Sequence, residues 1–120
     1  VTLGKNGAFA AAKRGGVFVP GFRTDAVDTT GAGDAFWGAF LYSACGLGTG
    51  SECAAARTDG STKAPGEARK KAILEIEPDD LKRIAVFSNA AAALCVAGRG
   101  AIPAMPNLSD VLDLTSTYRE

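Results

Sequence analysis

The sequence predicts an α/β layered domain. Strand-like apolar runs occupy the start of the 120-residue chain, and helical patterns follow them. Strands followed by helices that can cross back over them are typical of layered α/β folds. Because 47% of the residues are hydrophobic, the chain can supply one apolar core, and we expect a single ordinary domain or a part of one.

The strand-like runs come first. Residues 1–4 (VTLG) predict a short buried strand. Residues 7–20 (GAFAAAKRGGVFVP) contain two further runs on either side of Lys13 and Arg14, which predicts a hairpin. Residues 24–27 predict another short extended segment that leads into the first helix.

Two long helices and a short one are predicted next. The first covers residues 34–44, with apolar side chains at helical spacing and Gly46 where a C-terminal cap would lie. The second begins at Pro78, with acidic residues in its first turn, and ends at Gly98. One face of this second helix is apolar: Leu81, Ile84, Ala85, Ser88, Ala91, Ala92 and Cys95. The final helix covers residues 107–114.

Two features bear on the domain boundaries. Residues 57–71 (RTDGSTKAPGEARKK) are polar and rich in small residues, so we expect a solvated, mobile loop there. The chain opens on a strand-like run without an initiator methionine. We therefore expect residues 1–120 to be a segment of a longer protein.

Charge and cysteine content exclude several classes of partner. Lys and Arg number 13, Asp and Glu also 13, and the sequence pI is about 6.4, so we expect neither nucleic acid nor an anionic membrane as a partner. The longest nearly apolar run, residues 85–98, is too short to span a bilayer. Cys45, Cys53 and Cys95 are widely spaced, which favours reduced thiols in a cytoplasmic protein.

The chain contains no histidine. This excludes Ser-His-Asp and Cys-His nucleophilic arrangements, histidine general bases and metal sites that contain histidine. Any acid–base chemistry in this chain must therefore use carboxylates.

Residues 28–36 (DTTGAGDAF) carry the main chemical signal. Gly31, Ala32 and Gly33 have almost no side chains, so their backbone N–H groups can converge on one group while the following helix presents its positive end to the same point. Such a turn suits an anion, most naturally a phosphate. The chain contains no GxxxxGK[ST], so this is not a P-loop. It is not a dinucleotide-binding GxGxxG either, because Phe36 stands where the third glycine would be.

Asp34 follows this turn directly. An acid there would repel a resting phosphate, so its position favours a role toward the second reactant, a hydroxyl that attacks the phosphorus. Two plainer interpretations stay open. Asp34 can be a simple N-cap, and Asp28 can be a turn-former that bonds its own backbone.

The string DTTGAGDAF resembles the C-terminal signature of the ribokinase-like sugar kinases, also called the phosphofructokinase B family. The resemblance covers essentially the whole chain. Residues 1–8 (VTLGKNGA) look like that family's strand and loop beside the nucleotide phosphates, and residues 89–106 (NAAAALCVAGRGAIPAMP) look like its late helix and cation loop. Residues 33–42 (GDAFWGAFLY) are similar in particular to bacterial fructokinases.

The resemblance implies a fold and an activity. The fold is a three-layer ribokinase-like sandwich, of which this chain supplies the C-terminal, nucleotide-side portion. The activity is transfer of the γ-phosphate of ATP to a sugar hydroxyl, with fructose as the first expectation. The alternatives are kinase action on ribose, a nucleoside or another small alcohol, and a non-catalytic nucleotide-binding module. The implied partners are the sugar, ATP, the N-terminal part of the same kinase and a second copy in a homodimer.

The resemblance also implies roles for single residues. Asp34 matches the catalytic base, and the backbone of Gly31, Ala32 and Gly33 matches the anion hole. Residues that match nucleotide-binding positions are Thr2 and Gly4, beside the phosphates, and Asn89, near the adenine and ribose. The Asn-x-x-Glu segment that this family uses around magnesium does not occur in the chain, so we expect the chain alone to be inactive.

A monovalent cation, usually potassium in this family, is implied behind the anion hole. Its implied ligands are the Asp28 side chain, the Thr30 carbonyl, and the backbone carbonyls of Cys95, Gly98 and Gly100. One position departs from the pattern, because Ala104 stands where ribokinases often have serine. The oxygen that a serine side chain would offer is absent there.

Overall fold

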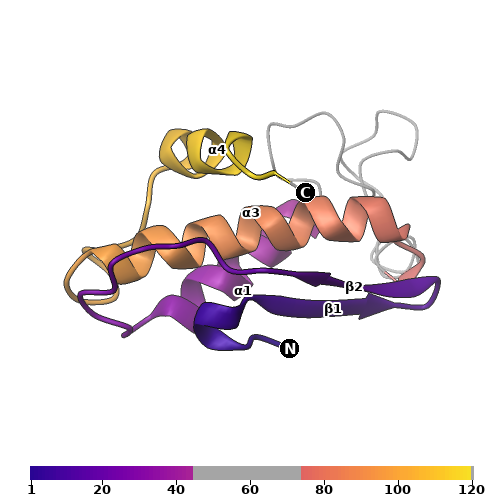
Figure 1. Ribbon diagram of the computed structural model, residues 1–120, viewed down its shortest axis with the longest axis horizontal. Coiled ribbons are helices and arrows are strands. Elements are labelled where there is room, and N and C mark those ends of the chain that lie inside the picture. Colours follow the sequence, from indigo (N-terminus) through magenta and orange to yellow (C-terminus); the bar gives the residue numbers. More distant parts are fainter. Residues whose placement is uncertain (45–73, 120) are drawn as a thin grey trace.

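The computed structural model describes residues 1–44 and 74–119, and its central element is α3 (Pro78–Ala97). In Figure 1, α3 runs between the β1–β2 hairpin on one side and α4 (Leu108–Ser116) on the other, with α1 (Ala32–Ala44) behind it. The α/β prediction is therefore confirmed for the described residues. Outside the described residues lie Cys45, Gly46, Cys53 and the predicted loop at 57–71.

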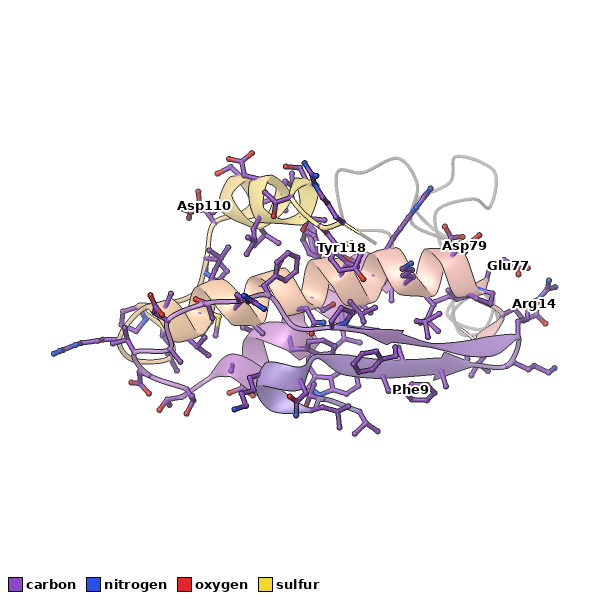
Figure 2. All side chains as sticks on the ribbon, viewed as in Figure 1. Phe9, Arg14, Glu77, Asp79, Asp110 and Tyr118 are labelled. Atoms are coloured by element: carbon purple, nitrogen blue, oxygen red, sulfur yellow. The ribbon has the colours of Figure 1, made fainter. Side chains whose placement is uncertain are left out.

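The predicted hairpin is confirmed. β1 (Ala8–Ala12) and β2 (Gly15–Val19) pair antiparallel across a two-residue loop. Side chains alternate across the hairpin: Ala8, Ala10 and Val19 are buried toward α3, whereas Phe9 and Phe18 are exposed. Arg14 in the loop forms an ion pair with Glu77, just before α3 (Figure 2), which ties the hairpin tip to the start of that helix.

The prediction of a buried strand at residues 1–4 is wrong. Thr2 makes one isolated bridge to Ala8, and Gly4 already begins η1 (Gly4–Asn6), a single 3-10 turn. The Val1 ammonium donates to the Phe9 carbonyl (2.6 Å), so these exposed residues fold back along the outer edge of β1. An early turn after three residues leaves too short a segment for a strand of its own.

The extended segment predicted at residues 24–27 joins no sheet within the described ranges. It runs beside α3, where the Val27 N–H donates to the Val96 carbonyl (2.8 Å). The predicted helices are confirmed with small shifts of their bounds. α1 begins two residues earlier than predicted, α3 ends at Ala97 with Gly98 as its C-cap, and α4 extends to Ser116.

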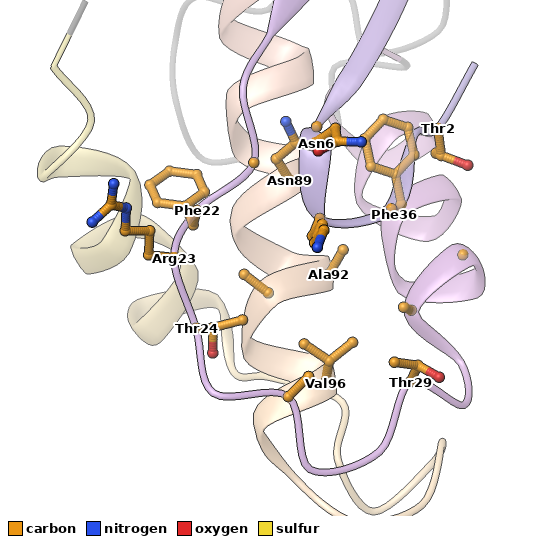
Figure 3. A pocket seen from close by; sticks show the side chains of 18 residues that line it. Thr2, Asn6, Phe22, Arg23, Thr24, Thr29, Phe36, Asn89, Ala92 and Val96 are labelled. Atoms are coloured by element: carbon orange, nitrogen blue, oxygen red, sulfur yellow. The ribbon is translucent and has the colours of Figure 1, made fainter.

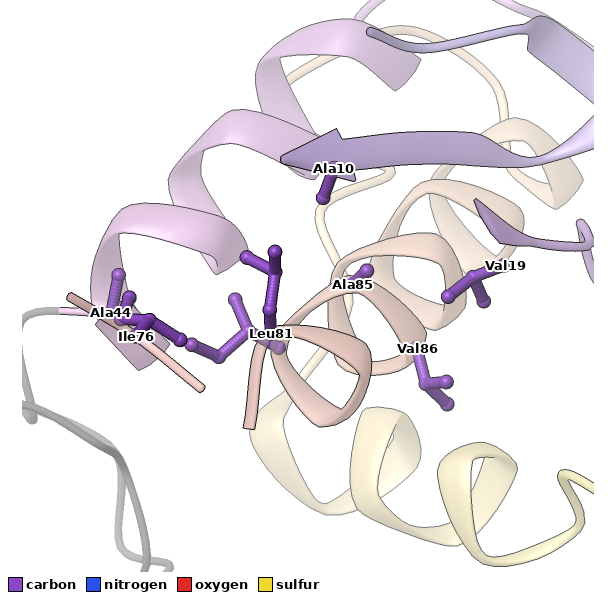
Figure 4. Packing of buried hydrophobic residues seen from close by; sticks show 8 residues of the cluster. Ala10, Val19, Ala44, Ile76, Leu81, Ala85 and Val86 are labelled. Carbon is purple, nitrogen blue, oxygen red and sulfur yellow. The ribbon is translucent and has the colours of Figure 1, made fainter. Parts of the chain in front are cut away.

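The core lies where the hairpin, the end of α1 and the first half of α3 meet (Figure 4). Its buried side chains are small or medium-sized and permit close approach of the three elements: Ala10, Val19, Ala44, Ile76, Leu81, Ile84, Ala85 and Val86. A smaller cluster of Ala90, Ala91 and Val111 joins α3 to α4. Because α3 has neighbours on several sides, it also buries Val86, Ala90 and Ala93, and its buried surface is wider than the one predicted face.

Among the helices of the described residues, none combines the length and the hydropathy that a membrane span requires.

Candidate functional site

A cavity of about 520 Å³ lies between η1, the segment after β2, the start of α1 and the C-terminal half of α3 (Figure 3). We call it the η1 cavity. Five of the residues predicted to contact a nucleotide or a phosphate line it: Thr2, Gly4, Ala32, Gly33 and Asn89. The fold thus brings the beginning of the chain, the glycine turn and α3 to one place.

The charges that line the η1 cavity are positive. Lys5 and Arg23 are its charged lining residues, and neither forms an ion pair with an acid within residues 1–44 or 74–119. Figure 3 shows Arg23 beside Phe22 on the far side of its segment, pointing away from the centre of the cavity. A cavity whose described lining contains a lysine and no acid favours an anionic ligand.

Lys5 is a lining residue that the predicted nucleotide contacts in residues 1–8, Thr2 and Gly4, do not include. The signal was available, because a lysine inside a glycine-containing loop is a common way to hold phosphates.

The first turn of α1 adds a second attraction for an anion. The N–H groups of Gly33 and Asp34 donate to no acceptor in the part of the chain that the structure describes, as is usual at the start of a helix. The Ala32 N–H donates to the Thr29 carbonyl (3.3 Å). Of the predicted anion-hole residues, Ala32 and Gly33 line the cavity and Gly31 does not.

Asp34 is not the N-cap of α1, so that plainer interpretation is wrong. The first intrahelical hydrogen bond runs from the Ala35 N–H to the Gly31 carbonyl (2.8 Å). A residue whose carbonyl accepts this first bond is the N-cap, and here it is Gly31. Asp34 is the third residue of the helix.

Asp34 lines a second hollow, of about 390 Å³, and is exposed. Successive residues of a helix point about 100° apart. Gly33 therefore lines the η1 cavity, whereas Asp34 lines the second hollow. The other wall of the second hollow carries apolar side chains such as Phe87 and Met105. The structure therefore places the predicted catalytic acid beside the predicted phosphate site and not within it.

Asn89 lies in the wall of the η1 cavity and is almost fully buried. Its side-chain amide donates to the carbonyls of Val19 (3.2 Å) and Pro20 (3.3 Å). These bonds hold the end of β2 against α3. A nucleotide contact would have to use the remaining oxygen, Oδ1, and the predicted role of Asn89 stays a prediction.

Asp28 ties two loops together. Its Oδ1 accepts the Thr30 N–H (2.9 Å) and its Oδ2 accepts the Gly100 N–H (3.0 Å). The interpretation of Asp28 as a turn-former is thereby confirmed. Hydrogen bonds from Thr30, followed by the one from Gly100, hold the pKa of this carboxyl below its usual value, so it is ionised at neutral pH.

The predicted cation ligands lie around Asp28. The buried Cys95 thiol is a weak donor to the Thr30 carbonyl (3.9 Å), and the Gly98 N–H donates to the Cys95 carbonyl (3.2 Å). Burial raises the pKa of the Cys95 thiol, and the charges of Asp28 and Asp34 raise it further, so it is not a thiolate at neutral pH. The donors that remain are carboxylate and carbonyl oxygens, which suit a hard cation.

Two details qualify this donor set. The methyl group of Ala104 packs beside Gly98, where a Cβ would meet it at 2.9 Å, so position 104 presents carbon and no oxygen. Within the described ranges, no group of three His, Cys, Asp or Glu side chains could hold a metal ion. Oxygens of the backbone would have to complete any cation site here.

A lysine-containing cavity at a helix N-terminus, with an acid next to it, favours a phosphorylated ligand. The comparisons with known proteins agree. Residues 1–62 match the model of the pfkB family carbohydrate kinases. The chain belongs to this family.

The chain is similar to plant fructokinases. "Probable fructokinase-5" of Arabidopsis thaliana is 40% identical over 95% of this chain, fructokinase of Solanum tuberosum 38% over 95%, and fructokinase-2 of Zea mays 36% over 80%. The chain spans 28%, 28% and 22% of these relatives. These relatives are plant proteins, so the finer resemblance to bacterial fructokinases stays a prediction.

Two solved structures share the fold. An uncharacterized sugar kinase from Pyrococcus horikoshii is 27% identical, with a TM-score of 0.59, over 96% of this chain and 29% of its own. Aminoimidazole riboside kinase from Salmonella enterica, complexed with aminoimidazole riboside and an ATP analog, is 28% identical with a TM-score of 0.55. The match covers 97% of this chain and 30% of the kinase chain. The prediction of a ribokinase-like α/β fold is confirmed, and the chain presents a part of that fold.

Proposed function

We propose that this chain is the nucleotide-side part of a kinase that transfers the γ-phosphate of ATP to a sugar hydroxyl, with fructose as the first substrate. The observation that carries the proposal is the η1 cavity, where neither Lys5 nor the Gly33 N–H has a partner among residues 1–44 and 74–119. The names of the plant relatives support fructose, and the ATP analog in the riboside kinase supports ATP.

In this mechanism the phosphates of ATP lie in the η1 cavity. The Gly33 N–H, the positive end of α1 and Lys5 offset the charge that builds up on the transferring group. Asp34, on the adjacent face, orients the acceptor hydroxyl and takes its proton. Because phosphoryl transfer passes through a loose transition state, positioning contributes more than basicity.

The test is an assay of the complete kinase with ATP and a panel of sugars. We expect phosphorylation of fructose above ribose, nucleosides and other small alcohols. Ribose, nucleosides and other small alcohols are the second candidate acceptors, because one structural neighbour is a riboside kinase. ATP binding without transfer to any acceptor would instead favour a non-catalytic nucleotide-binding module.

Replacement of Lys5 by alanine should raise the KM for ATP by roughly tenfold, the usual value of one lost hydrogen bond to a charged group. The effect should shrink as salt rises, since screening weakens the charge. Steady-state kinetics of the complete kinase measure both. Lys13→Ala, in the exposed hairpin loop, is the matched control and should leave the KM unchanged. An equal rise of the KM for ATP in the two variants would contradict a role for Lys5 in ATP binding.

Two metal ions belong to the proposal. Magnesium, when bound, neutralises phosphate charge, and its ligands are proposed to lie elsewhere in the complete kinase, because the described residues offer no such group. Potassium, when bound, supplies a positive charge behind the 31–33 turn. Asp28 and the carbonyls of Thr30, Cys95, Gly98 and Gly100 would hold it.

Replacement of Asp28 by alanine should weaken activation by potassium more than it changes the KM for the sugar, because Asp28 lies behind the turn. Activity titrated with potassium and with sodium measures this effect. Asp25→Ala removes a neighbouring exposed carboxylate and should behave as the unmodified kinase. A kinase that is indifferent to monovalent ions would rule out the cation site.

Large apolar side chains are exposed on α1 and on the hairpin. They are Trp37 (50% exposed) and Leu41 (57%) on α1, and Phe18 (53%) on the hairpin. We propose that the N-terminal part of the same kinase covers them, that the complete kinase forms a homodimer, and that it works in the cytoplasm, where Cys95 stays reduced. Expression of the N-terminal part as a separate chain should restore activity to this one.

A further inference from the structure

The loop of residues 98–104 lies directly behind Gly31. This glycine has a φ of +82°, and a Cβ on it would lie 2.7 Å from the Ala101 Cβ and 3.0 Å from the Ala101 Cα. Real Cβ atoms do not approach other atoms this closely, so the Gly31 backbone rests against Ala101 without room for a side chain. The position of the glycine turn is therefore limited by one methyl group.

Asp28 holds this loop in place from the other side. Its Oδ2 accepts the Gly100 N–H, and its Oδ1 accepts the Thr30 N–H. One carboxylate thus joins the residue before Ala101 to the residue before Gly31. Hydrogen bonds to an ionised carboxylate are among the stronger ones in proteins, so the loop and the turn are linked both by contact and by charge.

Gly31 also determines where α1 begins. The Gly31 carbonyl accepts the first intrahelical hydrogen bond, from the Ala35 N–H (2.8 Å), and two residues later Gly33 lines the η1 cavity. A shift of Gly31 therefore moves the N–H group that the proposed function aims at the phosphate.

We propose that Ala101 is a positioning residue for the phosphate-facing end of α1. Its methyl group fixes how far Gly31 can recede from the η1 cavity, and Asp28 keeps the loop in register. The activity part of this inference rests on the proposed kinase function. Ala101 touches neither nucleotide nor acceptor in this assignment.

A double-mutant cycle in the complete kinase tests the contact. Ala101→Gly should lower kcat by about tenfold, because small misplacements of catalytic groups are costly, and should leave the KM for ATP within about twofold. Gly31→Ala should lower kcat further. Ala101→Gly in the Gly31→Ala background should then raise kcat by about fivefold, since contacting residues couple and the missing methyl makes room.

Two controls separate positioning from general disruption. Ala101→Ser keeps the Cβ and should retain kcat. Ile102→Ala changes the next residue, whose side chain is 85% exposed, and should also leave kcat unchanged. An Ala101→Gly variant with unchanged kcat, or losses that simply add in the double variant, would overturn the proposal.

A readout without activity keeps this test separate from the kinase assignment. The Ala35 amide, which donates to Gly31, should exchange its hydrogen about tenfold faster in Ala101→Gly than in Ile102→Ala, because the turn opens more often. If the complete kinase phosphorylates no acceptor, the proposed function fails and this exchange rate alone decides on Ala101. Equal rates in the two variants would overturn the inference.

Discussion

Replacement of Asp34 by asparagine should lower the turnover of the complete kinase by about 10² to 10⁴, the usual range for a positioned acid–base group. The amide cannot take the proton of the acceptor hydroxyl. Binding of ATP should stay nearly intact, because Asp34 lines the hollow beside the η1 cavity and not the cavity itself. Steady-state kinetics with separate kcat and KM values measure both effects.

The matched control is Asp79→Asn. Asp79 is also an exposed acid in the first turn of a long helix, α3, so the substitution makes the same change to charge and helix dipole far from the glycine turn (Figure 2). We expect it to leave turnover unchanged. Wild-type turnover in Asp34→Asn, or an equal loss in both variants, would contradict a catalytic role for Asp34.

Replacement of Gly7 by alanine should lower the free energy of unfolding by about 3 kcal/mol or more. Gly7 is buried, with a φ of +109°, and a Cβ there would lie 2.0 Å from the Val19 carbonyl oxygen and 2.6 Å from the Gly21 nitrogen. Both obstacles are backbone atoms and cannot rotate away. Because Gly7 and Gly21 both line the η1 cavity, affinity for ATP should fall as well. Thermal or denaturant unfolding and nucleotide titration measure the two losses.

Gly38→Ala is the comparison for Gly7. Gly38 lies inside α1, and a Cβ there would meet nothing within 4 Å. Alanine favours a helix interior over glycine by up to about 1 kcal/mol, so this variant should be slightly more stable. A Gly7→Ala protein as stable as Gly38→Ala would show that η1 and the end of β2 are packed more loosely than the distances indicate.

Much of the fold could be predicted because local signals and tertiary contacts agree. Pro78 and Gly98 bound a helix that packs as its pattern indicates, and Lys13 and Arg14 form the loop of the expected hairpin. The prediction at residues 1–4 failed because an apolar run does not show where the chain reverses. Gly4 begins a turn there, and contacts with Ala8 and Phe9 hold Val1 and Thr2 along the edge of β1.

The candidate site was predictable where a motif keeps its groups close in sequence. The glycine turn and Asp34 are neighbours, so their joint position at the start of α1 followed from residues 28–36. The direction of the Asp34 side chain depended on where the helix begins, at Ala32 and not at residue 34. The contact between Gly31 and Ala101 joins distant segments and leaves no periodic signal in the sequence.

In the proposed function, the η1 cavity receives the phosphates of ATP while Asp34 faces the acceptor. A crystal structure of the complete kinase with a non-hydrolysable ATP analog and fructose tests it most directly. We expect the terminal phosphate within hydrogen-bond distance of the Gly33 N–H, Lys5 beside the phosphates, and a hydrogen bond between a fructose hydroxyl and Asp34. An analog bound outside the η1 cavity, or an Asp34 without contact to the acceptor, would contradict it.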